Sequence, residues 1–470
     1  MSRLNKVSKK IALLTITMII VPTLTVKAQD KKDIVEKDSI ISTFKMFAQI
    51  RPRFEVRDGQ FRPLVSNEQA AILVSDRLRL TMDYAYKGDV LTLRVAPQVV
   101  SVWGQANLVQ GPENIGNKFA LHETWAKLKI SPSWYTQIGR QVISLDDERV
   151  FGASDWAQGA RVHDAVSVHF KKKKFEVKGF FAYNQNYKAM YDNNINNLTG
   201  NGFNPTDAAP YKLMQTVWAS LPVGEKSSVT LLATNIGFQQ ATVANKKAPE
   251  YYSQTFGANY FWTIPSSKLQ GQVAGYFQTG RNSAGAKVEA YTATVNMRYS
   301  STGAWALSLG SDLISGNDVG KAQTKNSMFN PYFTTGHKFY GFMDYFHAGY
   351  GHRGTGISDN YLKMEWVKRV GKKQNWLGIA LDLHQFFTPN KVMDSNNKTY
   401  KRNLGQEVDL TIRYDINEFV LLVGGYSLYA TNETIKFLKG VPNARFAQQW
   451  AWVSINITPK LFEVKTTHKK

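Results

Sequence analysis

Hydrophobic and polar residues alternate along most of the chain. Between residues 407 and 414 the sequence reads EVDLTIRY, so every second side chain is polar and those between them are apolar. Successive strand residues point to opposite faces. The segment therefore predicts a strand with one apolar face and one ionic face. A half-buried sheet of a soluble protein could show the same pattern, so the rest of the chain has to decide.

Runs of this kind recur and predict an antiparallel sheet of eighteen strands, with sixteen as the alternative count. The predicted strands are residues 44–55, 72–85, 89–103, 119–130, 133–143, 162–170, 175–186, 210–221, 227–240, 250–263, 268–280, 287–300, 303–314, 358–368, 376–388, 404–414, 419–430 and 445–457. Each is about long enough to cross a bilayer at a tilt.

The connections between these strands alternate in length. The short ones are residues 86–88, 131–132, 171–174, 222–226, 264–267, 301–302, 369–375 and 415–418. The connections between them, mostly longer, are residues 56–71, 104–118, 144–161, 187–209, 241–249, 281–286, 315–357, 389–403 and 431–444. In an up-and-down sheet, this order places all tight turns on one side. It is typical of an all-β transmembrane barrel with short periplasmic turns and longer outer loops.

A membrane barrel also explains the two-faced strands, because each strand meets hydrocarbon outside and water inside. In the segment 303–313, we expect Leu307 and Leu309 to face lipid, and Ser308 and Asp312 to face the lumen. Aromatic residues near strand ends fit interfacial girdles. They include Trp134, Trp218, Trp305, Trp366 and Trp452.

The first residues resemble an export signal. A basic segment precedes the apolar run 11–21, and a small-residue cleavage pattern follows at residues 26–28. That run is too short for a membrane-spanning helix, which needs roughly 20 residues. The predicted organisation is a cleaved signal peptide at 1–28, a short periplasmic segment at 29–43, the barrel at 44–457 and a short basic tail at 458–470.

Charge and composition narrow the function. Removing the signal peptide takes away five positive charges and no negative ones, so the formal net charge falls from +22 to +17. Such a field attracts anions. The chain has no cysteine, so neither disulfides nor thiolate metal sites can form. We expect a Gram-negative outer-membrane location, with membrane lipid, acidic solutes and the barrel-assembly machinery as partners, and no nucleic acid.

The alternation predicts which charged residues line the pore and the substrate path. These are Arg77, Arg79, Arg94, Glu123, Lys127, Arg298, Lys363, Glu365, Asp382 and Arg413. Arginine can hold carboxylates or phosphates through paired hydrogen bonds, which suits the passage of acidic solutes. For any single pair, the alternative is that opposite charges only neutralise each other and stiffen the wall.

Signals for chemistry are weak. The G-x-G-x-x-G match at 349–354 is followed by a turn and a strand rather than a helix, so it does not predict nucleotide binding. His347 and His352 lie in the same loop without a carboxylate cluster at ligand spacing. We expect no enzyme activity, cofactor or metal. Lys171 to Lys174 fall in a predicted tight turn, where they would form a solvated end to a hairpin.

Two stretches resemble the alginate export family of outer-membrane barrels. The first covers residues 121–164, and its matching positions are Gly139, Arg140, Gln141, Asp147, Glu148, Arg149, Gly152, Asp155, Trp156, Arg161 and Asp164. The second is GHKFYGFMDYF at 336–346 together with LDLHQFF at 381–387. The first match is the more specific, because many unlike residues agree in order.

This resemblance implies an eighteen-stranded barrel that moves an anionic polysaccharide passively through a basic channel. The resemblance also adds three arginines to the predicted pore lining and substrate path. They are Arg140 on a strand wall, Arg149 in a loop at the mouth and Arg161 at the start of the next strand. Every predicted periplasmic turn is short, so a lid would have to be an outer loop, with residues 315–357 the best candidate by length.

Three other functions remain open from the sequence. One is a general or small-anion porin. Another is a barrel enzyme using His163, His169 or His384. The third is a soluble carbohydrate-binding sandwich, which would be recovered without detergent.

Overall fold

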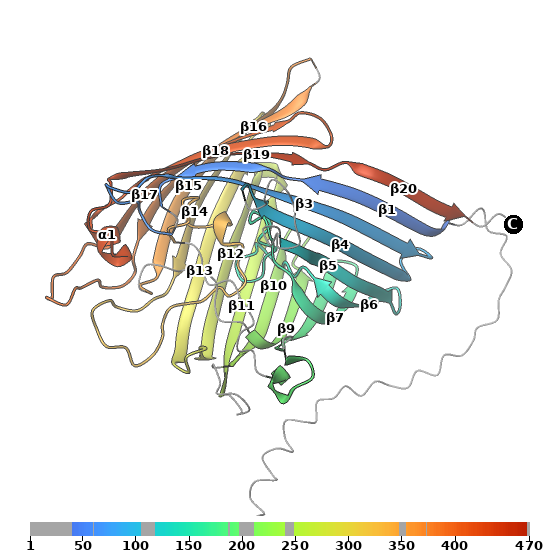
Figure 1. The fold of residues 1–470 in the computed structure, drawn as a ribbon, viewed down its shortest axis with the longest axis horizontal. Helices are drawn as coiled ribbons and strands as arrows, with labels where there is room; N and C mark the ends of the chain where they lie inside the picture. The colour runs from blue at the N-terminus through green and yellow to red at the C-terminus, as the bar shows by residue number, and fades with distance from the viewer. Residues whose placement is uncertain are drawn as a thin grey trace, which may run out of the picture. The chain divides into compact units, whose positions relative to one another are not determined.

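Long antiparallel strands make up nearly all the regular structure of the computed structural model (Figure 1). The structure describes residues 40–59, 61–104, 118–186, 189–196, 211–239, 249–346, 354–372 and 374–467. The strands are β1 Ile40–Ile50, β2 Arg53–Arg57, β3 Ala71–Tyr86, β4 Leu91–Val102, β5 Lys118–Lys129, β6 Trp134–Gln141, β7 His163–Lys172, β8 Phe175–Tyr183, β9 Tyr211–Pro222, β10 Ser228–Gln239, β11 Glu250–Ile264, β12 Leu269–Arg281, β13 Lys287–Ser300, β14 Trp305–Ile314, β15 Ile357–Val370, β16 Asn375–Phe387, β17 Asn403–Asp415, β18 Val420–Ala430, β19 Ala447–Ile457 and β20 Lys460–Thr467.

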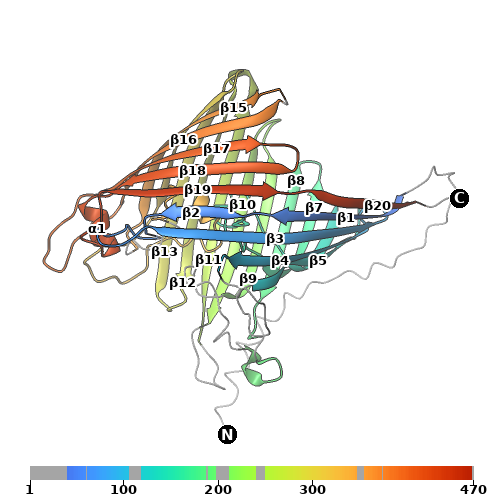
Figure 2. The ribbon, with the colours of Figure 1, turned by 45° about the horizontal axis from the view of Figure 1, so that its top comes forward.

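Two interrupted strands close the sheet into a barrel. β1 pairs with β3 along one edge and with β20 along the other, whereas β2 pairs with β3 and β19. β1 and β2 are thus two halves of one crossing, and β19 and β20 are two halves of another (Figure 2). Pro52 and Pro459 lie at the two interruptions, since proline has no N–H to offer a neighbouring strand.

Counted as crossings, the strands form a closed, antiparallel, eighteen-stranded barrel. This confirms the predicted fold class and strand count, and it excludes the two-sheet sandwich. Short and long connections alternate as predicted. Because barrels of this kind have short periplasmic turns, the ends joined by the tight turns face the periplasm.

The C-terminal boundary differs from the prediction. The expected tail at 458–470 belongs to the sheet as far as Thr467, because β20 pairs with β1. Phe462 and Val464 lie opposite Met46 and Phe44, so the segment continues the alternation although lysines surround it. Residues 1–39 and 468–470, including the expected signal peptide, lie outside the described residues.

The two faces of the wall agree with the predicted alternation. The side chains of Leu307 and Leu309 are 46% and 60% exposed on the outer face, whereas Asp312 is 2% exposed on the lumen side. The rings of Trp305 and Trp366 lie 6.5 Å apart on the outer face. Trp218 and Trp452 are buried instead, because they pack against other parts of the chain that lie inside the barrel.

Helical structure is minor in the described residues. The helix α1, Glu433–Lys439, lies in the β18–β19 connection, and short 3-10 turns occur at Asn193–Asn196, Pro265–Ser267 and Gly336–Lys338. No helix in the described ranges is long and apolar enough to cross a membrane.

Candidate functional site

Two outer loops fold into the lumen and pack against each other. We call residues 142–162, between β6 and β7, loop A, and residues 315–346, after β14, loop B. The rings of Phe151 and Phe333 lie 5.1 Å apart, and the backbone N–H of Gly152 donates to the carbonyl oxygen of Phe333 at 2.8 Å. Both phenylalanines are buried, so the two loops share a hydrophobic core inside the barrel.

The first end of loop A is held by acidic residues and one arginine. Asp146 accepts hydrogen bonds from Trp218 Nε1 at 2.9 Å and from Asn259 Nδ2 at 3.2 Å. Arg149, whose side chain is 3% exposed, pairs with Asp147 and with Asp312 of β14, each at 3.1 Å. This end is therefore fixed to the wall formed by β9 to β14.

The second end of loop A is held on a different part of the wall. Asp155 pairs with Arg77 of β3 at 2.9 Å, with Arg51 at 3.4 Å and with Arg79 at 3.6 Å. Trp156 lies under the guanidinium of Arg53, 4.2 Å from the ring centroid. Loop A thus crosses the lumen from the β9–β14 side to the β1–β3 side.

Loop B is docked by its backbone on buried carboxylates. The N–H of Met343 donates to Glu407 at 2.7 Å, and the N–H of Phe342 donates to Asp409 at 3.4 Å. Gly341 has a φ of 80°, and a Cβ there would lie 2.5 Å from the Glu407 carboxylate. Only glycine fits both the backbone conformation and this close approach.

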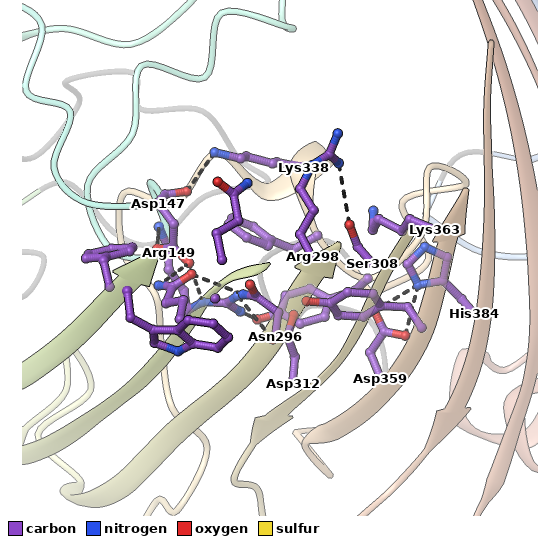
Figure 3. Close-up of a pocket in the computed structure, with 18 of the residues that line it drawn as sticks. Asp147, Arg149, Asn296, Arg298, Ser308, Asp312, Lys338, Asp359, Lys363 and His384 are labelled. Carbon is purple, nitrogen blue, oxygen red and sulfur yellow. Dashed lines mark hydrogen bonds and ion pairs between the residues drawn. The ribbon is translucent and has the colours of Figure 1, made fainter. Parts of the chain in front are cut away.

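A cavity of about 480 Å³ lies between the loops and the β11–β16 wall (Figure 3). Arg298 of β13, Lys338 of loop B and Lys363 of β15 reach it from three elements. Figure 3 shows their cationic groups along one side of the cavity. Lys338 Nζ donates to the carbonyl oxygen of Asp147 at 2.9 Å, which leaves further donors on the ammonium for a solute.

Carboxylates accompany the cationic groups of this cavity. Lys363 Nζ lies 2.6 Å from Asp382, and Arg298 pairs with Glu365. The cations are therefore partly neutralised. To bind an anionic solute, each cation would exchange its carboxylate partner in the protein for the solute. Such sites bind weakly enough for a solute to leave, as conduction requires.

A second cavity of about 510 Å³ shares Lys338 and Lys363 with the first. Its lining adds the rings of Trp156, Phe342 and Trp452. The two lysines thus lie where the two cavities meet, beside the aromatic rings of the second. Flat apolar ring faces next to cations suit a solute with both apolar and acidic parts.

Eight of the predicted site residues lie on the lumen side outside the loop anchors. They are Arg94, Glu123, Lys127, Arg298, Lys363, Glu365, Asp382 and Arg413. Several are paired along the wall, as Arg94 is with Asp83 at 2.7 Å. The sequence had suggested either a charged pore lining or opposite charges that neutralise each other. These residues do both, because they face the lumen and several of them are paired.

Other predicted residues hold the loops instead of lining an open path. Arg77 is fully buried and Arg149 nearly so, which corrects their assignment as pore-lining. Arg79, 13% exposed, bonds Gln98 Oε1 at 2.8 Å beside Asp155. Arg161 donates to the carbonyl oxygen of Thr334 at 2.7 Å and so joins loop A to loop B. Their charges are used within the protein.

Arg140 faces away from the lumen, which is a second correction. It lies opposite Asp164 in the β6–β7 ladder and pairs with it at 2.8 Å. Ile138 and Val166 share this face and are 53% and 41% exposed on the outside of the barrel. By the alternation along β6, Gly139 faces the lumen and Arg140 faces outward.

The three histidines considered for catalysis are buried. His163 Nδ1 lies 2.9 Å from the hydroxyl oxygen of Tyr211. His169 Nε2 lies 2.8 Å from Ser167 Oγ, but Ser167 is 1% exposed and so presents no hydroxyl to a substrate. His384 bonds Asp359 at 2.9 Å in the wall. His347 and His352 lie outside the described residues. Within those residues, no group of three or more His, Asp or Glu side chains could hold a metal ion.

Known proteins resemble this chain in both sequence and fold. The family model described as Alginate export matches residues 43–349. The chain belongs to the alginate export family. A search of the curated proteins gives no match.

Solved structures similar to this alginate export barrel include OccK5 (OpdH) of Pseudomonas aeruginosa, OccAB1 of Acinetobacter baumannii, and OpdK of Pseudomonas aeruginosa with vanillate. Their sequence identities are 11%, 13% and 9%, and their TM-scores are 0.58, 0.57 and 0.54. The matches cover 89%, 89% and 88% of this chain, and 98%, 97% and 98% of theirs. These likenesses show a shared fold. Family and fold together make the protein a multi-pass outer-membrane channel.

The segments that resemble the alginate export family in sequence are those that meet inside the barrel. Residues 144–161 fall in loop A, residues 336–346 in loop B, and Phe346 packs on Phe386 of β16 with ring centroids 4.6 Å apart. Sequence reasoning missed Lys338 and Trp156 as lumen residues. Both lie in loops, where no periodicity indicates which side chains point inward.

Proposed function

We propose that this alginate export barrel passively conducts an anionic polysaccharide or oligosaccharide across the outer membrane. The main support is the convergence of Arg298, Lys338 and Lys363 on one lumen cavity, each from a different element. Glu365 and Asp382 beside them would stop an acidic chain from binding too tightly. The basic balance of the whole chain agrees with an anionic solute.

Ion selectivity in planar bilayers tests this proposal. Replacing Arg298, Lys338 and Lys363 together by glutamine should lower the anion-to-cation permeability ratio, because a unit charge at 4 Å is worth about 1 kcal/mol even at the dielectric constant of water. Each charge removed should therefore reduce the ratio by up to about fivefold. Reversal potentials under a salt gradient measure the change.

Arg140→Gln is the control for the position of the charge, because it removes a positive charge from the side of the barrel wall that faces away from the lumen. Its selectivity should equal that of the wild type. A cation-selective wild-type channel, or a triple variant with unchanged selectivity, would contradict the proposal.

A second candidate is a porin for small acids. The cavities of about 480 and 510 Å³ and the crossing of the lumen by loop A favour small solutes. OpdK, which shares the fold, was crystallised with vanillate, itself a small carboxylate. Flux of acidic oligosaccharides of increasing length separates the two candidates, since a small-acid porin passes the monomer and stops the longer chains.

A further inference from the structure

The turn between β7 and β8 carries four consecutive lysines that the channel function does not use. Lys171 to Lys174 are all exposed. Glu176 on the lumen face lies 3.7 Å from Lys171 and 3.3 Å from Lys178, so that carboxylate is shared by lumen-side lysines. Lys172 and Lys173 lie beyond this group, at the end of the strand and in the turn.

The outward face of this hairpin is aromatic directly above the lysines. Phe170 lies opposite Trp134 and Lys172 lies opposite Phe175, which puts all four on one face. The rings of Trp134 and Phe170 are 4.8 Å apart, and those of Phe170 and Phe175 are 5.9 Å apart.

The parity of β7 shows that this is the lipid side. Val166 and Val168 have the same parity as Phe170 and are 41% and 43% exposed, whereas Ser167 and His169 are buried toward the lumen. The aromatic cluster therefore belongs to the outer surface of the barrel, with the lysines at its periplasmic edge.

The depth of the cluster in the membrane follows from the fold. Aromatic girdles lie at the head-group level, and the tight turns lie on the periplasmic side. Lys172 and Lys173 therefore lie at the depth of lipid phosphates in the inner leaflet. The neighbouring β9–β10 turn adds Lys226 and one carboxylate, Glu225, whose backbone carbonyl accepts a hydrogen bond from Lys174 Nζ at 2.9 Å. Positive charge remains in excess over this pair of turns.

We propose that the β7–β8 turn binds the head group of an anionic phospholipid in the inner leaflet. The lysine ammonium groups meet the phosphate, and the Trp134, Phe170 and Phe175 rings contact the glycerol and upper acyl region. A basic cluster next to an interface attracts anionic lipid by about fivefold per lysine. The site would fix the position of this part of the wall in the membrane, whatever solute passes through the lumen.

Lipid retention tests the proposal. The full-length processed protein is reconstituted into vesicles of phosphatidylethanolamine and phosphatidylglycerol in equal amounts and extracted in mild detergent, and the lipid that stays bound is measured by mass spectrometry. We expect retained phosphatidylglycerol in the wild type, and about a tenfold or greater loss in Lys172→Gln/Lys173→Gln. Equal retention of the two lipids by the wild type would overturn the proposal.

Lys171→Gln/Lys178→Gln is the matched control, because it removes the same charge from the lumen face of the same hairpin. It should retain phosphatidylglycerol like the wild type, and an equal loss in both variants would refute a site on the outer face. Wild-type retention should also fall with added salt, so retention that does not respond to salt would overturn the proposal without any variant. An unfolding temperature in detergent equal to that of the wild type in both variants shows that the barrel is intact.

Discussion

Arg149→Met should loosen the attachment of loop A to the β9–β14 wall and raise the single-channel conductance. The substitution keeps a long side chain but leaves Asp147 and Asp312 without their cation, and Asp312 is 2% exposed. Breaking a buried ion pair from one side costs about 3–5 kcal/mol. Arg149 also contacts Tyr340 of loop B, 3.3 Å from its hydroxyl, so both loops should loosen. Planar-bilayer recording measures the conductance, and thermal unfolding in detergent measures the stability.

Arg413→Met provides the control for this variant. Arg413 also lies on the lumen face, but it is 58% exposed and pairs only with the strand-end residue Asp415 among the contacts described. Its loss should change stability by no more than about 0.5 kcal/mol. A conductance and stability of Arg149→Met equal to those of Arg413→Met would show that the Arg149 ion pairs do not hold loop A.

Asp155→Asn should release the other end of loop A. Three arginines lose their shared counter-charge, and one of them, Arg77, is fully buried. A lost hydrogen bond to a charged group costs about 1.5–3 kcal/mol, and here the guanidinium cannot turn to water instead. Faster digestion of loop A by an added protease, with the barrel still folded, would report the release.

Asp155 also predicts how the attachment of loop A depends on pH. Burial alone would raise the pKa of Asp155, but the hydrogen bond and charge of Arg77, with Arg51 and Arg79, outweigh burial and hold the pKa below its ordinary value of 3.8. A carboxyl with a lowered pKa contributes stability above its ordinary value and loses it as the pH falls through the lower folded value. The wild-type loop should therefore loosen only in strong acid, and Asp155→Asn should lose this transition. A transition that persists in the variant would assign it to another group.

The barrel itself could be predicted from the sequence because each strand faces lipid on one side and water on the other. Apolar and polar side chains must therefore alternate with a period of two residues. Leu307 and Leu309 outside and Asp312 inside follow from parity alone. The same parity groups Arg140 with Ile138, so the outward position of Arg140 was available from the sequence. The family resemblance pointed the other way for this residue.

The interior of the barrel could not be predicted in this way. Loop A and loop B have no period, and their contacts join positions far apart in the chain, such as Arg149 with Asp312 and Met343 with Glu407. The length of residues 315–357 suggested a lid, but no sequence pattern shows which of its backbone N–H groups meet buried carboxylates. β20 was missed because its lysines concealed a short alternating run.

Loop A has a mechanical consequence for the barrel. Its two ends are fastened by ion pairs to β14 and to β3, so it acts as a brace across the lumen. If one wall is displaced, the brace transmits the force to the other wall. Lateral pressure from the membrane is thus resisted by side chains across the diameter as well as by hydrogen bonds around the circumference.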